Sequence, residues 1–184
     1  MANISTTTGR PVFDPVRTIW QFAAVAVGWC ALILAAPRIH TGPDVHRVAL
    51  TAHLLSLAAG FGAVLAVDGY ALAVLRGRRG VADLLAFSAV ADRFIWAGFA
   101  GLAVSGAYLD PDLGSAWADL NLVAVFVAGL NGVYARTVRD RLPALPPGAG
   151  VRALPRQWLL RAVCAGLLSQ AAWWTSILVG SLTS

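Results

Sequence analysis

The chain has 184 residues, of which 58% are hydrophobic and 12% are charged, and its formal net charge is +5. Because its mean hydropathy of +0.70 is higher than that of most soluble domains, a lipid bilayer is its expected surroundings. All 14 basic residues are arginines, and the absence of lysine excludes a retinal Schiff base, a pyridoxal Schiff base and a phosphate-loop lysine.

The chain begins with a polar segment, residues 1–16, which Pro11 and Pro15 interrupt and which we expect to form a cytoplasmic tail. The remainder, 17–184, is expected to be a single transmembrane domain. Its apolar segments are each long enough to cross a hydrocarbon layer about 30 Å thick. These predicted spans cover about 18–36, 48–75, 81–109, 117–138 and 157–182. The sequence therefore predicts an all-α integral membrane bundle of about five transmembrane helices.

The arginines lie mostly at the ends of the apolar segments, which argues for a role in topology and against nucleic-acid binding. A cytoplasmic N-terminus places only Arg38 and Arg47 outside and puts the C-terminus outside as well. The inner side would then carry Arg10, Arg17, Arg76, Arg78, Arg79, Arg136, Arg139, Arg141, Arg152, Arg156 and Arg161. This distribution predicts that the N-terminus is cytoplasmic.

Polar residues inside the spans are the candidates for function, because a charge at the bilayer centre costs about 2.5–3.5 kcal/mol even on lenient scales. The inner candidates are Asp68, Asp92, Arg93 and Asn131. At about 1.5 Å of helix rise per residue, they lie roughly 10–18 Å from the inner ends of their helices. We expect Arg93 to pair with Asp68 or with Asp92. The cluster could fix helix packing or bind a proton, a cation or a polar substrate.

The second predicted span carries His53 and Asp68 on one face, since successive helical residues advance by about 100°. Gly60 and Val64 lie on the same stripe. A glycine on this stripe would let a neighbouring helix approach closely. We therefore expect this face to pack against the third span.

A second candidate group, nearer the outer side, comprises His40, His46 and His53. Histidine can ligate a metal or haem iron, transfer a proton or simply form hydrogen bonds in a packed helix. These interpretations remain open for His53, because His46 lies about 10 Å away along the same helix. Three tryptophans are candidates for lining a haem or quinone pocket, with packing as the alternative: Trp96, Trp173 and Trp174.

Several short motifs in the second and third spans resemble the copper-resistance-D-like group of bacterial membrane proteins. They are His53-Leu54-Leu55 followed by Gly60 and Gly62, then Trp96 with Gly98, and Ser105-Gly106. The resemblance covers about sixty residues. It implies a multi-helix bundle in the bacterial cytoplasmic (inner) membrane, a role in copper handling and a functional position at His53.

The favoured function is the handling of a small ion, either a proton or a metal, or of a polar solute, through the polar cluster. One alternative is a haem- or quinone-associated membrane subunit of a redox complex, with His53 as an axial ligand. The candidate cofactors are haem and a copper ion. Another is a non-catalytic accessory subunit. An enzyme is less favoured, because no catalytic motif is recognisable. The expected partners are the lipid bilayer and a homo-oligomer or membrane complex.

Overall fold

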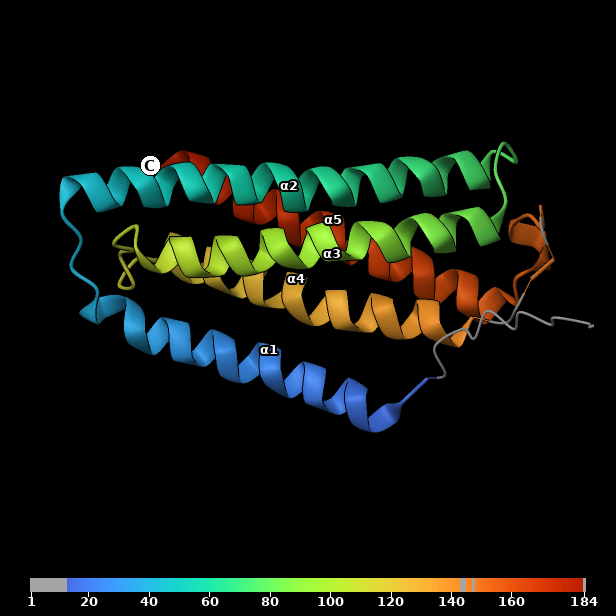
Figure 1. Ribbon diagram of the computed structural model, residues 1–184, viewed down its shortest axis with the longest axis horizontal. Helices are drawn as coiled ribbons and strands as arrows, with labels where there is room; N and C mark the ends of the chain where they lie inside the picture. Colours follow the sequence, from blue (N-terminus) through green and yellow to red (C-terminus); the bar gives the residue numbers. More distant parts are fainter. Residues whose placement is uncertain (1–12, 143–144, 147, 184) are drawn as a thin grey trace, which may run out of the picture.

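A computed structural model describes residues 13–142, 145–146 and 148–183 of the chain (Figure 1). Within these residues, two short 3-10 turns, Ala36–Arg38 and Val151–Ala153, accompany five long α-helices, and there is no strand. The helices are α1 (Pro15–Ala35), α2 (Pro43–Leu75), α3 (Val81–Ala107), α4 (Ala116–Arg141) and α5 (Arg156–Thr183). Each of the five is long and apolar enough to cross a membrane. The predicted all-α bundle of five spans is confirmed.

Two helices begin earlier than the sequence suggested, and a proline starts each of them. Asp14 caps α1, because its carboxylate accepts hydrogen bonds from the backbone N–H groups of Val16 (2.9 Å) and Arg17 (3.2 Å). Pro15 and Pro43 occupy the first turns of α1 and α2, where the missing N–H of proline has no intrahelical partner to lose. The predicted tail 1–16 is therefore corrected at its end, while residues 1–12 lie outside the described residues.

The helices form two antiparallel hairpins, α2–α3 and α4–α5, with α1 beside α4 and α3 (Figure 1). Helix α1 slants away from the others, and none of its residues is buried. The start of α1, the α2–α3 turn and the α4–α5 connection lie at the same end of the bundle, called the N-terminal end below. There the N–H of Val81 donates to the carbonyl oxygen of Ala149 (2.9 Å), which ties the connection to α3.

Helices α2 and α3 pack closely because glycines face each other where they meet. A Cβ atom added at Gly60 would lie 3.1 Å from the Cα of Gly98. One added at Gly98 would lie 2.6 Å from the carbonyl oxygen of Ser56. Such contacts leave no room for a side chain at Gly98, so the backbones can approach this closely only with glycine there. The expected packing of this face against the third span is confirmed at Gly60 and His53, whereas Asp68 on the same face bonds to α5.

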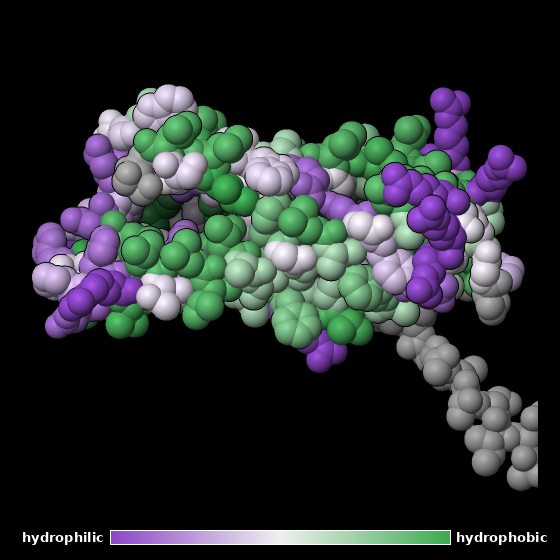
Figure 2. Space-filling view, turned by 90° about the horizontal axis from the view of Figure 1, so that it is seen from above, coloured by the Kyte–Doolittle hydropathy of each residue, from purple (hydrophilic) through white to green (hydrophobic). Residues whose placement is uncertain are grey.

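An apolar cluster joins this hairpin to α5. Its buried members are Phe61, Val64, Leu102 and Trp173. The ring centroid of Phe61 lies 5.7 Å from that of Trp173 and 5.2 Å from that of Trp174. Apolar side chains predominate over the middle of the face in Figure 2, among a few hydrophilic ones, and most hydrophilic side chains gather towards its two ends. That distribution fits a bundle surrounded by lipid along its middle.

Candidate functional site

The polar side chains inside the bundle form separate small groups, each linking two helices. One group lies between α3 and α4, a second between α2 and α5, a third between α2 and α3, and a fourth between α4 and α5. The sequence predicted one inner cluster and one outer histidine group. The tertiary structure divides the inner residues among different pairs of helices.

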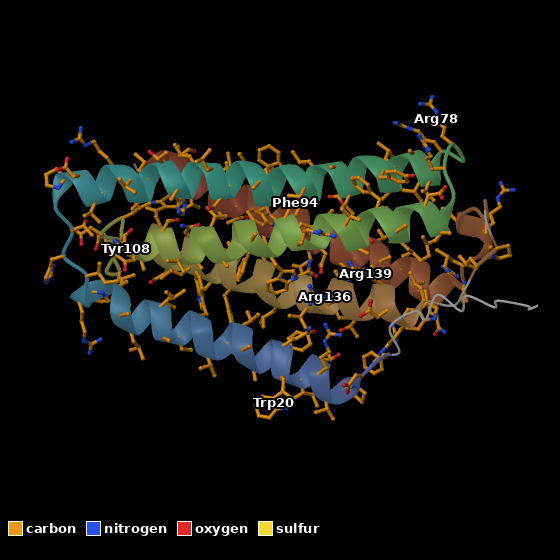
Figure 3. The ribbon with its side chains drawn as sticks, in the orientation of Figure 1. Trp20, Arg78, Phe94, Tyr108, Arg136 and Arg139 are labelled. Atoms are coloured by element: carbon orange, nitrogen blue, oxygen red, sulfur yellow. The ribbon has the colours of Figure 1, made fainter. Side chains whose placement is uncertain are left out.

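The first group, called the Asp92 ion cluster, comprises Asp92, Arg136 and Arg139. Arg136 donates to the Asp92 carboxylate, and a terminal nitrogen of Arg139 lies 3.7 Å from the same carboxylate oxygen. Arg139 also donates to the carbonyl oxygen of Ser88 (3.2 Å). Both arginines come from the last two turns of α4 (Figure 3). Two cations therefore meet one carboxylate and tie α4 to α3. The Nε of Arg139 also lies 3.5 Å from the carboxylate of Asp140 on its own helix.

The role of these arginines was missed by the sequence analysis, which assigned them to the inner surface through topology alone. Their three-residue spacing, Arg136 to Arg139, places both on one face of a helix, and that signal could have indicated a common partner. Trp96 contributes to the cluster, because the Arg136 guanidinium carbon lies 5.5 Å from the centroid of its ring. The indole N–H of Trp96 and the Nε of Arg136 are buried without a hydrogen-bond partner among the described residues.

The second group, called the Asp68 chain, comprises Asp68, Gln170 and Trp174. The side-chain nitrogen of Gln170 donates to the Asp68 carboxylate, although the two residues are 102 positions apart in the sequence. The indole N–H of Trp174 donates to the side-chain oxygen of Gln170 (2.9 Å). Since an indole N–H can only donate, this bond orients the amide so that its NH₂ faces Asp68. No ion pair joins Asp68 to an arginine within the described ranges.

The expected pair between Arg93 and Asp68 does not form among the described residues. Arg93 is exposed on α3, whereas Asp92 is part-buried and bonded to α4. Adjacent residues of a helix differ by about 100° in direction, so Asp92 and Arg93 cannot both face the same neighbour. The hydrogen-bond donor to Asp68 comes from α5, whereas the depths calculated from the sequence compared residues of the second, third and fourth spans only. Gln170 was therefore missed, although a glutamine deep in an apolar span was itself a signal.

His53 joins α2 to the outer half of α3, the half away from the N-terminal end. Its Nδ1 lies 3.0 Å from the hydroxyl oxygen of Ser105, and that hydroxyl donates to the carbonyl oxygen of Gly101 (2.5 Å). Because a serine hydroxyl carries one hydrogen, this geometry assigns the proton on the imidazole to Nδ1. His40 is exposed and His46 half-buried. In the part of the chain that the structure describes, no three His, Cys, Asp or Glu side chains group closely enough to hold a metal.

Asn131 links α4 to α5 and is only 5% exposed. Its amide nitrogen donates to the carbonyl oxygen of Ala165 (2.8 Å), while its side-chain oxygen has no partner among the described residues. Farther along the same two helices, the Ser176 hydroxyl donates to the side chain of Asn121 (2.6 Å). Asn131 therefore holds a helix pair together and does not join the two aspartates.

The three candidate tryptophans do not form one pocket. Trp96 packs against Arg136 of α4, whereas Trp173 and Trp174 pack against Phe61 of α2. A polar cavity of about 20 Å³ lies elsewhere, between the start of α1 and the end of α4. A volume of this order holds about one water molecule. Trp174 serves instead as a hydrogen-bond donor, Trp96 as a cation–π partner and Trp173 as part of the apolar core.

Searches among protein families, curated proteins and solved structures found no match to this chain. The resemblance to copper-resistance-D-like proteins stays a prediction, and so does the copper handling that it implies.

Proposed function

We propose that this multi-pass membrane protein handles protons, with Asp68 as the residue that takes up and releases them. One observation carries the proposal: Asp68 lies well inside a helix and has a neutral amide as its partner, with no cation paired to it in the described residues. An ionised carboxylate in apolar surroundings loses hydration that one amide replaces only in part. Acidic residues of this kind within spans commonly mark proton or ion pathways.

The orientation of Gln170 favours a proton over a metal ion as the species bound. Metal cations of the kind that carboxylates bind require several oxygen ligands. The amide presents its NH₂ to Asp68, and its oxygen is occupied by Trp174. A proton needs only one carboxylate oxygen, and the other can still accept from Gln170. Asp68 therefore suits the smallest cation.

His53 is a second group able to carry a proton, because the assigned tautomer leaves its Nε2 as an acceptor. It lies fifteen residues before Asp68 on α2, which corresponds to about 22 Å along the helix axis. Direct transfer between the two is too long, and bridging waters would have to connect them. The proposal therefore assigns the two residues to separate steps.

The proposal places the N-terminus in the cytoplasm and the C-terminus outside, in the bacterial cytoplasmic membrane. The excess of arginines at the N-terminal end supports this orientation, including Arg76, Arg78 and Arg79 in the α2–α3 turn. Asp68 then lies in the inner half of the membrane. Reporter fusions at the C-terminus should be active only outside the cytoplasm. A cytoplasmic C-terminus would reverse the side from which Asp68 is reached.

Proton flux into vesicles tests the proposal directly. The purified chain is reconstituted around a pH-sensitive dye, a potassium gradient with valinomycin sets the membrane potential, and the internal pH is followed. We expect flux above that of protein-free vesicles, and we expect Asp68→Asn to return it to that background. Asp44→Asn is the matched control, because Asp44 is exposed in the first turn of α2.

Infrared spectroscopy supplies an independent measurement of the same group. The native chain should show a pH-dependent carbonyl band from protonated carboxylic acids, and the contribution of Asp68 to that band should be missing from the spectrum of Asp68→Asn. Native protein that conducts no protons, with a spectrum that Asp68→Asn leaves unchanged, would contradict the proposal.

A further inference from the structure

The middle of α3 carries a charged side chain on its outer face. Arg93 is exposed, although it lies twelve residues after the first residue of α3 and fourteen before the last. In the described helices, every other exposed charged residue lies within six residues of a helix end. Positions near the ends can reach the headgroups, whereas a residue at the centre of a span faces hydrocarbon. Arg93 is therefore the exposed charge that a bilayer accommodates least easily.

The residues around Arg93 form a regular stripe along this face, called the α3 outer stripe. Exposed residues recur along it at alternating intervals of four and three: Ala86, Val90, Arg93, Ala97, Ala100 and Val104. This spacing is the one with which two helices pack along a common seam. The alanines let another helix approach closely, as small residues do at helix contacts in membranes. Phe94, labelled in Figure 3, flanks the stripe and is 52% exposed.

The described chain contains no anion that neutralises Arg93. The adjacent Asp92 points about 100° away around α3 and is bonded to Arg136 and Arg139 of α4. Asp68 is bonded to Gln170 between α2 and α5. We infer that the α3 outer stripe docks a transmembrane helix of a different protein, which carries a carboxylate at the level of Arg93. This inference does not depend on proton handling by Asp68.

A second copy of this chain fits the stripe less well than a different protein does. Two copies joined symmetrically along α3 would bring their Arg93 side chains together, and like charges repel. The exposed aspartates of the described chain lie in loops, at a helix cap or within four residues of a helix end: Asp14, Asp44, Asp83, Asp110, Asp112 and Asp119. None of them lies at the level of Arg93. Charge complementarity therefore favours a partner with an acidic residue in its own span.

A synthetic probe can test this surface without knowledge of the natural partner. The probe is a membrane-spanning leucine–alanine peptide with a single central Asp, and its association with the full chain is followed by fluorescence energy transfer in phosphatidylcholine vesicles. We expect Arg93→Gln to weaken association about tenfold, which corresponds to about 1.4 kcal/mol. Replacing the peptide Asp by Leu should weaken it equally.

A charge swap separates this effect from misfolding. Arg93→Glu should lose the Asp peptide and gain association with a matched peptide that carries a central Lys. Ala97→Leu should weaken binding by filling the stripe. Ala171→Leu should leave it unchanged, because Ala171 is exposed on α5, away from the stripe.

Two outcomes would overturn the inference. In the first, Arg93→Gln binds the Asp peptide as well as the native chain does but immobilises less spin-labelled phosphatidylglycerol. That result would show that Arg93 binds a lipid phosphate. In the second, differently labelled copies of the native chain show energy transfer, and Arg93→Gln abolishes it. That result would show that the stripe joins two copies.

Discussion

The α2–α3 hairpin carries an aspartate inside each of its helices, and the partners of the two carboxylates differ in charge. Asp92 on α3 receives two arginines from α4, whereas Asp68 on α2 receives one neutral amide from α5. The residue type is the same and the hairpin is shared, so the difference comes from the helix that lies opposite. A carboxylate that two cations neutralise serves to hold helices together. One bonded only to an amide keeps the capacity to change its charge.

The largest effect should come from removing the charge of Asp92. Asp92→Asn leaves Arg136 part-buried without its anion, while Arg139 keeps the carboxylate of Asp140 at 3.5 Å. Breaking a buried ion pair from one side costs about 3–5 kcal/mol. We expect a loss near the lower limit, about 3 kcal/mol, because these side chains are 19–23% exposed. Unfolding of the purified chain in detergent micelles measures it.

The double variant Asp92→Asn with Arg136→Gln is the control for this change. Removing both charges should recover part of the stability, since Arg139 is then the remaining cation. Losses that simply add would show that Asp92 and Arg136 are not coupled.

A change in the shared hairpin should affect both aspartates at once. Gly98→Ala would place a Cβ atom 2.6 Å from the carbonyl oxygen of Ser56, which forces α2 and α3 apart. Crowding of this kind costs about 1–3 kcal/mol. Unfolding in detergent should show this loss, and proton flux in vesicles should also fall. Gly62→Ala should change neither, because a Cβ atom there meets nothing within 4 Å. A Gly98→Ala protein that is destabilised but has normal proton flux would show that the Asp68 chain does not depend on the contact between α2 and α3.

Removing the charge of Asp68 should cost much less stability than removing that of Asp92. Asp68→Asn keeps an acceptor for Gln170, and hydrogen bonds between membrane helices contribute about 0.6 kcal/mol on average. We expect a loss below about 1 kcal/mol in the same unfolding measurement, together with complete loss of proton flux. A destabilisation as large as that of Asp92→Asn would mean that Asp68 has a structural role, and the contrast between the two sites would fail.

The smallest effect is expected at the far end of the Asp68 chain. Trp174→Phe removes the donor to the Gln170 oxygen while keeping an aromatic ring against Phe61. Stability should fall by about 0.5 kcal/mol, since one partly exposed bond is lost. Gln170 is then free to rotate, so the rate of proton flux should change while the flux remains. Flux identical to that of the native chain would show that the amide orientation is unimportant.

The sequence by itself determined the spans and one helix contact. Apolar length set the number of helices, because about 20 apolar residues are needed to cross hydrocarbon. The stripe with Gly60 indicated the face of α2 that meets α3, since a helix turns by a constant angle per residue. The first residues of α1 and α2 were predicted too late in the chain, because Pro15 and Pro43 can begin a helix as well as interrupt one. Local rules of this kind operate within a few turns.

Only the tertiary structure decided which polar residues meet. Asp68 bonds to Gln170 across 102 positions, and Asp92 bonds to Arg136 across 44. Sequence spacing gives the direction of a side chain relative to its own helix axis and its depth along that axis. It does not say which helix lies opposite, because that depends on how all five pack together. For the same reason Arg93, expected inside the bundle, lies on its outer face.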